Sequence, residues 1–196
     1  MTVQKGISAF SFIGICGAIL FATLPLWFAL WPETLGVTAV DLTAHILILM
    51  GMLGIYFNHA DKLGKFGFIA VVGVVIGFVF QIFMKAASGF IKPVLLEYVP
   101  QTLENQIAPS PLGEVIMAAF IIFPLSIVLF GLAIGLSKIP QRKLGFLLMV
   151  SPFGFVIPFG IFISPILFAF IFISIAYPIV KGRKEQQTAR QLVNGS

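Results

Sequence analysis

An uncharged run of 37 residues, from Leu144 to Val180, constrains the fold of this chain more than any other feature. As one helix it would be about 55 Å long, at about 1.5 Å of rise per residue, against about 30 Å of bilayer hydrocarbon. Basic residues flank both ends: Lys138, Arg142 and Lys143 before the run, and Lys181, Arg183 and Lys184 after it. By the positive-inside rule both ends face the cytoplasm, so the run enters a membrane and returns.

The composition agrees with an integral membrane protein. Hydrophobic residues make up 59% of the chain and charged residues only 10%, which is more apolar surface than a soluble core of this size can use. The formal charge of +5 comes from basic residues in short loops, not from a continuous basic face. Such charges orient a protein toward anionic lipid, and they do not indicate a nucleic-acid partner. Cys16, the single cysteine, excludes an intramolecular disulfide.

Hydropathy predicts an all-α fold, a polytopic transmembrane helix bundle that forms one domain over residues 1–196. The predicted spans are about 7–30, 42–58, 66–84, 114–136, 144–160 and 162–180. The second and third spans form a hairpin around the polar turn from His59 to Lys65. Pro152 interrupts the short fifth span, for which a re-entrant segment is the alternative.

Two segments lie outside the predicted spans. Residues 85–113 form the one sizeable outer loop, and residues 181–196 form a basic cytoplasmic tail. Within the loop a short amphipathic surface helix is expected, from apolar side chains at helical spacing. These are Ile91, Val94, Leu95, Tyr98 and Val99.

The distribution of basic residues predicts that both termini are cytoplasmic. With six spans, ten basic residues fall inside, and only Lys85 and Lys92 fall outside. With five spans, the basic residues of the tail would fall outside, which the positive-inside rule disfavours.

A repeated pattern suggests that the second hairpin duplicates the first. At an offset of 81 residues, Lys62-Leu63-Gly64 aligns with Lys143-Leu144-Gly145. Gly54, Gly73, Ile76 and Phe78 likewise align with Gly135, Gly154, Ile157 and Phe159. Parallel repeats of this kind occur in transporters, although an apolar chain also produces such matches by composition alone.

Pairs of small residues predict close contacts between helices. Gly73 and Gly77, and Gly131 and Gly135, are each four residues apart, the spacing at which two transmembrane helices approach closely. Packing inside the bundle is the favoured interpretation, and a dimer face is the alternative.

Few polar residues lie in or near the spans. The candidates for a polar site are Asp41, His45, Gln81, Glu114 and Ser126. Asp41 and His45 are four residues apart and share a helix face, where the carboxylate orients the imidazole or shares a proton with it. One interpretation is an external cation site. The other is that Asp41 caps the helix amino terminus and that the other acidic residues predicted on the outer side, Glu33, Glu97, Glu104 and Glu114, are simply solvated.

Signatures of catalysis and cofactor binding are missing from the sequence. It contains no G-x-S-x-G, P-loop, G-x-G-x-x-G or H-E-x-x-H motif. We therefore predict no catalytic residues, no metal ligands and no cofactor.

Two stretches resemble a broad group of small bacterial multi-pass membrane proteins. They are Gly51–Tyr56 followed by Asp61–Gly67, and Phe130–Gly135 followed by Ile139–Arg142. The resemblance implies a bacterial plasma-membrane protein and carries no activity or site residues.

Two classes of function remain open at this stage. The first is a non-catalytic membrane component or accessory subunit, which packs in the lipid bilayer against a second membrane protein or another copy of itself. It is favoured because ion pathways usually need more intramembrane charge. The second is a small transporter or channel, supported by the proline-broken fifth span and the suggested repeat.

Overall fold

The computed structural model describes residues 3–31, 34–98, 110, 112–156 and 160–194. Every regular element among them is helical, which confirms the predicted all-α class. The helices are α1 (Val3–Leu30), α2 (Leu35–Ala86), α3 (Lys92–Tyr98), α4 (Leu112–Leu136), α5 (Arg142–Val150) and α6 (Gly160–Asn194). A π-helical turn, η1 (Ala87–Ile91), precedes α3, and a 3₁₀ turn, η3 (Ser151–Val156), follows α5.

Four of these helical stretches are long and apolar enough to cross a membrane. They are Val3–Leu30, Leu35–Leu95, Gly113–Leu136 and Phe162–Gly182. Most large side chains on their outer faces are apolar, as in Phe120, Ile121 and Phe170, which are each more than 60% exposed. This surface supports a membrane location, because lipid is the solvent that matches it.

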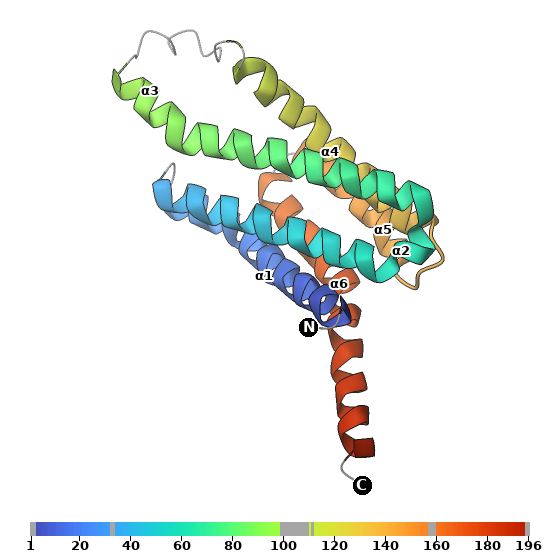
Figure 1. Cartoon of the computed structure of the whole chain (residues 1–196). Coiled ribbons are helices and arrows are strands. Elements are labelled where there is room, and N and C mark those ends of the chain that lie inside the picture. Colours follow the sequence, from blue (N-terminus) through green and yellow to red (C-terminus); the bar gives the residue numbers. More distant parts are fainter. Residues whose placement is uncertain (1–2, 32–33, 99–109, 111, 157–159, 195–196) are drawn as a thin grey trace.

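The 52-residue helix α2 is a hairpin of two antiparallel arms. The chain reverses at Gly64, whose φ of 58° and ψ of −154° are non-helical and are readily adopted only by glycine. In Figure 1 the first arm runs in cyan to the turn and the second returns in green beside it. An ion pair from Asp41 to Lys85 joins the arms at the end away from the turn. The arms correspond to the predicted spans 42–58 and 66–84.

Close backbone contacts join α1 to the first arm of α2. A Cβ atom added to Gly51 would lie 2.5 Å from Cα of Gly14 and 2.6 Å from the ring of Phe172 in α6. Farther along, Gly17 faces Leu47 and Gly54 faces Ser11, so residue numbers rise along α1 as they fall along α2. Since lipid provides no hydrophobic drive between helices, this close approach is what lets dispersion forces hold α1 in place.

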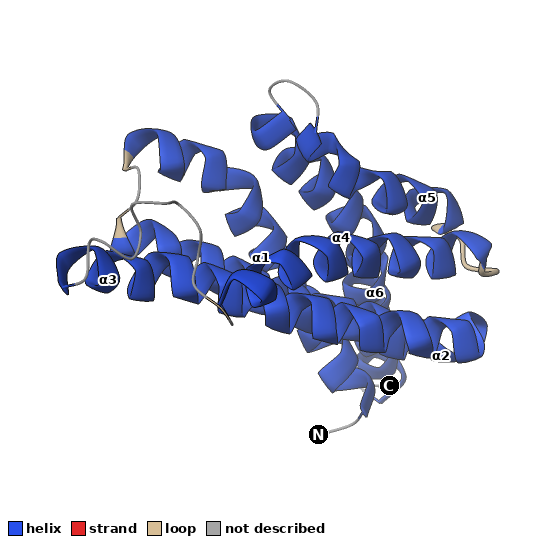
Figure 2. Cartoon of the chain, turned by 90° about the horizontal axis from the view of Figure 1, so that it is seen from above, coloured by secondary structure: helices blue, strands red, loops and turns tan. Residues whose placement is uncertain are grey.

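The four glycines predicted to pack helices lie at contacts inside the chain. A Cβ atom added to Gly77 would lie 2.5 Å from Oγ of Ser126 in α4, and one added to Gly73 would lie 4.0 Å from Cβ of the same serine. Gly131 and Gly135 face α5, which approaches with its own Gly145. Figure 2, viewed from above, shows α4 and α5 lying side by side. The bundle therefore uses these positions for its own packing.

The predicted fifth span, 144–160, is shorter and more broken than expected. It consists of nine residues of α5 followed by the 3₁₀ turn η3, and six complete spans are not confirmed. Pro152 explains the change, because two residues after α5 ends it lacks the N–H that a regular helical hydrogen bond needs. The two ends of the uncharged run nevertheless lie at the same end of the bundle, since Gln141 before it and Ile179 near its end line one pocket.

The two proposed repeat hairpins turn in different ways. The arms of α2 join directly through Gly64, whereas α4 and α5 are joined by the non-helical residues 137–141. Gly145, which aligns with Gly64, instead lies buried inside α5 against Gly135. Duplication therefore stays a prediction from the sequence.

Helix replaces the start of the predicted outer loop 85–113. The second arm of α2 passes through η1 into α3, so the expected amphipathic helix is a continuation of the span as far as Tyr98. In the wide turn η1 the N–H of Lys92 donates to the carbonyl of Ala87, which lets the helix continue into Pro93. Val99, the last residue of the predicted pattern, lies outside the described residues.

The predicted tail, 181–196, also begins as helix. The backbone of α6 continues to Asn194, and Figure 1 shows it projecting past the other helices. The predicted span 162–180 and most of the tail thus form one element.

We expect Gly51→Ala to lower the unfolding free energy by about 1–3 kcal/mol, the usual cost of overpacking. The added methyl would collide with the Gly14 backbone, which cannot move aside as a flexible side chain can. The measurement is SDS-titration unfolding of the purified protein in mixed micelles.

The matched control is Gly6→Ala, in a helical position with no atom within 4 Å of the new Cβ. It should be neutral or stabilising by up to about 1 kcal/mol, because alanine favours helix. Equal losses in both variants would show that the α1–α2 contact is not close.

Candidate functional site

Asp41 lies at the centre of a buried polar cluster between the arms of α2. Its Oδ2 lies 2.7 Å from Nζ of Lys85, and its Oδ1 lies 3.0 Å from Nδ1 of His45. Asp41 and His45 are each 2% exposed, and the Lys85 side chain is 28% exposed. A carboxylate taken out of water this completely requires such partners, because an unpaired buried charge is strongly unfavourable.

The hydrogen bonds of the cluster leave one carboxylate oxygen unused. His45 Nδ1 donates to the main-chain carbonyl of Asp41 at 2.8 Å, with the proton placed on this nitrogen. Oδ1 of Asp41 is close to the same nitrogen but is buried without a hydrogen bond of its own. Its nearest donor, His45 Nδ1, is shared with the main-chain carbonyl, so a further group that donates a hydrogen bond would satisfy Oδ1.

Three phenylalanines surround the His45 ring. Phe21 contacts it edge to face with centroids 5.3 Å apart, and Phe78 and Phe123 lie at 6.1 and 6.0 Å. They come from α1, the second arm of α2 and α4. The imidazole is thus fixed by helices that are remote from it in sequence, and its ring orientation is set by packing.

The cluster forms one wall of a large cavity between the helices. The cavity has a volume of about 750 Å³, within the range of small-molecule sites. Apart from Asp41, His45, Gln81, Lys85 and Ser151, its lining is apolar. The apolar part includes seven phenylalanines: Phe21, Phe28, Phe78, Phe120, Phe123, Phe162 and Phe168.

Proline interrupts the helices that enclose this cavity. Pro25 of α1, Pro124 of α4, Pro152 of η3 and Pro165 of α6 all line it. Each proline removes a backbone donor and bends or loosens its helix. Broken backbone at membrane depth is tolerated where it borders a cavity or is covered by protein.

The structure brings three of the five predicted polar residues together. Asp41, His45 and Gln81 line the cavity. Ser126 is 2% exposed, donates to the carbonyl of Phe123 at 2.7 Å, and packs against Gly77 instead. Glu114 is exposed in the first turn of α4, where a carboxylate suits the helix dipole.

Lys85 is the functional residue that the sequence did not reveal. We placed it in the outer loop as a topological charge, yet it is the ion-pair partner of Asp41. The sequence did contain one indication of this role, because a carboxylate inside a membrane span, such as that of Asp41, needs a cation at the same depth in the membrane. An antiparallel hairpin around residue 64 brings the end of its second arm to that depth.

The cluster is not suited to hold a metal ion. Among the described residues, no group of three or more His, Cys, Asp or Glu side chains is placed to bind one. The expected cation site would therefore consist of Asp41 and His45, and the Lys85 ammonium already occupies one oxygen. Chemically, the cluster can accept or donate a proton and bind a polar group.

Comparisons of this chain with protein-family models, with curated proteins and with solved structures give no match. The function is therefore argued from the geometry of the site.

We expect Lys85→Met to lower the unfolding free energy by about 3 kcal/mol. This is the lower end of the cost of leaving a buried charge unpaired, because Lys85 is partly exposed. The double variant Asp41→Asn, Lys85→Met should recover more than half of the loss, since no unpaired charge then remains. SDS-titration unfolding measures all three proteins.

Lys92→Met is the control, because Lys92 is exposed on the same helical stretch. Its effect should stay within about 0.5 kcal/mol. A loss equal to that of Lys85→Met would mean that the Asp41 contact does not stabilise the fold.

Proposed function

We propose that this chain is a small multi-pass membrane transporter that holds an amphipathic molecule in the cavity beside Asp41. The observation that carries the proposal is the cavity of about 750 Å³ with buried ionisable groups on one wall. Ionisable residues inside membrane helices are costly, and where they border a cavity they commonly mark a substrate or proton path. A bundle that served only as packing would have no use for them.

The lining indicates the chemistry of the substrate. Its many phenylalanine rings suit an apolar body, and the unused Oδ1 of Asp41 suits a hydroxyl or amine that donates a hydrogen bond. With the Asp41 and Lys85 charges paired, the wall has no large net charge while His45 is neutral. An amphipathic, weakly charged organic molecule fits these conditions.

The proposed topology has five full crossings and one broken segment. α1, the two arms of α2, α4 and α6 cross the membrane, and α5 with η3 enters it and meets α6 below the far surface. Both termini then face the cytoplasm of a bacterial plasma membrane. The charges support this, because Lys62, Lys138, Arg142 and Lys181 all lie at one end of the bundle, at or beside one pocket.

An accessory subunit is the second candidate function. It is favoured by the extension of α6 to Asn194, which projects from the bundle and offers a helix to a partner protein or a second copy (Figure 1). Neither candidate requires catalysis. Stoichiometric co-purification of another membrane protein, lost when residues 183–196 are deleted, would favour this role.

Binding of 1-aminoanthracene tests the transporter proposal. This probe combines an apolar three-ring body with one amine, and we expect saturable binding to the protein in nanodiscs. Trp27 and Trp31, at the end of α1 whose Phe28 and Ala29 line the cavity, serve as energy-transfer donors, and the saturable part of the signal reports binding. Anthracene, which lacks the amine, should bind about tenfold more weakly, the value of one hydrogen bond to a charged group.

A matched pair of variants locates the probe. Ala119→Phe fills the cavity from a fully buried position and should abolish saturable binding, whereas Ala39→Phe lies on an exposed face outside the lining. Equal binding to both variants, or equal affinity for the two probes, would contradict the proposed site.

A further inference from the structure

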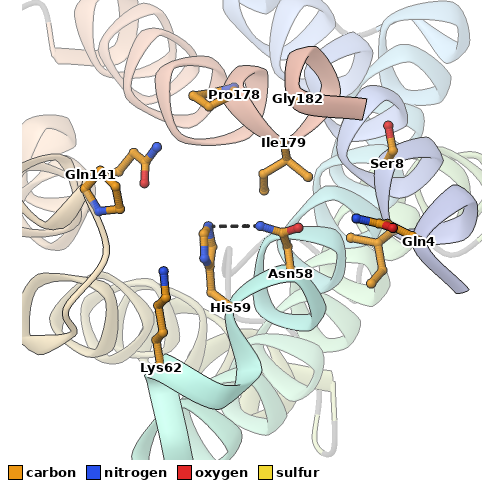
Figure 3. A pocket seen from close by; sticks show the side chains of 11 residues that line it. Gln4, Ser8, Asn58, His59, Lys62, Gln141, Pro178, Ile179 and Gly182 are labelled. Atoms are coloured by element: carbon orange, nitrogen blue, oxygen red, sulfur yellow. Dashed lines mark hydrogen bonds between the residues drawn. The ribbon is translucent and has the colours of Figure 1, made fainter. Parts of the chain in front are cut away.

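A second pocket lies at the opposite end of the bundle from Asp41. It has a volume of about 260 Å³ and is formed where four segments meet. These are the start of α1, the end of the first arm of α2, the turn before α5, and α6 around Pro178. Figure 3 shows their side chains converging on one space.

The described polar side chains of this pocket include one cation and no anion. Lys62 contributes an ammonium, and His59 and Asn58 lie beside it, with their Nε2 and Nδ2 atoms 3.3 Å apart. Gln4 and Ser8 of α1 face them across the pocket (Figure 3). Among the described lining residues there is no carboxylate, and no described acid forms an ion pair with Lys62. An anion is the ligand that such a set recognises.

Gln141 adds an acceptor that needs a hydrogen-bond donor from the ligand. Its Oε1 is buried and accepts no hydrogen bond within the described structure. Once the Gln141 amide turns toward the pocket, a ligand that brings a hydroxyl would satisfy this oxygen while its anionic part meets Lys62. The pocket therefore combines anion recognition with one acceptor for a donor group.

The position of the pocket matches the depth of lipid headgroups. Asn58 and Ile179 lie where the apolar stretches of their helices end, and Lys138, Arg142 and Lys181 are exposed nearby in the chain. Basic pockets between transmembrane helices on the cytoplasmic side are known to hold anionic headgroups. The volume suits a headgroup and is too small for a whole lipid or a nucleotide.

We propose that this pocket binds the phosphate of a glycerol phosphate group, with Lys62 at the phosphate and Gln141 Oε1 at a glycerol hydroxyl. Two sources carry this chemistry: the headgroup of phosphatidylglycerol and soluble glycerol 3-phosphate. The site is separate from the Asp41 cavity, since the two share no lining residue.

Native mass spectrometry of the full chain in detergent, titrated with phosphatidylglycerol or phosphatidylcholine, tests the site. We expect one phosphatidylglycerol to be retained in preference to phosphatidylcholine. Lys62→Gln should weaken this retention about tenfold, since it removes a hydrogen bond to a charged group. Gln141→Leu should remove the preference for phosphatidylglycerol over phosphatidic acid, which lacks the glycerol hydroxyls.

Lys65→Gln is the matched control, because Lys65 is exposed in the same turn as Lys62 but does not line the pocket. It should change retention by at most about twofold, as expected of an exposed surface charge. Equal loss in Lys62→Gln and Lys65→Gln would overturn the proposal in favour of general attraction to the basic surface. Equal retention of the two lipids by the unaltered protein would overturn it as well.

Glycerol 3-phosphate added at millimolar concentration distinguishes the two sources. Displacement of bound phosphatidylglycerol, together with one-to-one binding in lipid-free detergent, would identify the soluble compound as a ligand. Retention of the lipid without displacement would identify the membrane as the source. In either case the Lys62 and Gln141 variants must show the losses given above.

Discussion

The ion pair between Asp41 and Lys85 is the interaction on which one half of the bundle depends, the half that contains the Asp41 cavity. The arms of α2 are joined covalently near Gly64, and the ion pair joins them again at the far end. Between these points the arms hold His45 against Phe78, and α1 and α4 complete the ring of phenylalanines around it. A charge pair shielded from water on this scale resists separation, because parting it would leave two unpaired charges in apolar surroundings. The geometry of the cavity wall is fixed by the same contact.

The other half of the bundle, toward the Gly64 turn, is held by a different kind of interaction. There the helices approach through glycine, at Gly14 with Gly51 and at Gly131 and Gly135 with α5. Large side chains such as Phe130 and Phe172 fill the remaining space completely. Dispersion over many close contacts holds the helices together here. Close glycine contacts thus pack the helices tightly between the Asp41 cavity and the basic pocket.

The sequence predicted most of the helices, because length, hydropathy and flanking charge act locally. It also placed Asp41 next to His45, since four residues on a helix define a shared face. It did not place Lys85, because the partner of a buried charge depends on the register of the whole hairpin. Nor did it show that Ser126 lies outside the cavity lining, because a serine inside a span can satisfy its hydroxyl by donating to a carbonyl one turn earlier, here that of Phe123. Whether Pro152 would end a helix or bend it also depended on packing, here of η3 against α6.

The close helix contact between the Asp41 cavity and the basic pocket determines what transport would require. The cavity lies above the contact of Gly14, Gly51 and Phe172, and the basic pocket lies below it. At this seam the glycine backbones of α1 and the first arm of α2 are in contact. A substrate held beside Asp41 could reach the other side only if α1 and α6 moved away from the first arm of α2. Pro25 and Pro165, which border the cavity, are the positions in those helices where backbone hydrogen bonds are already interrupted, so bending there would cost least. In the proposed transporter, the proline-broken helices would therefore supply the hinge, and the cavity beside Asp41 would hold the substrate that the bending carries across.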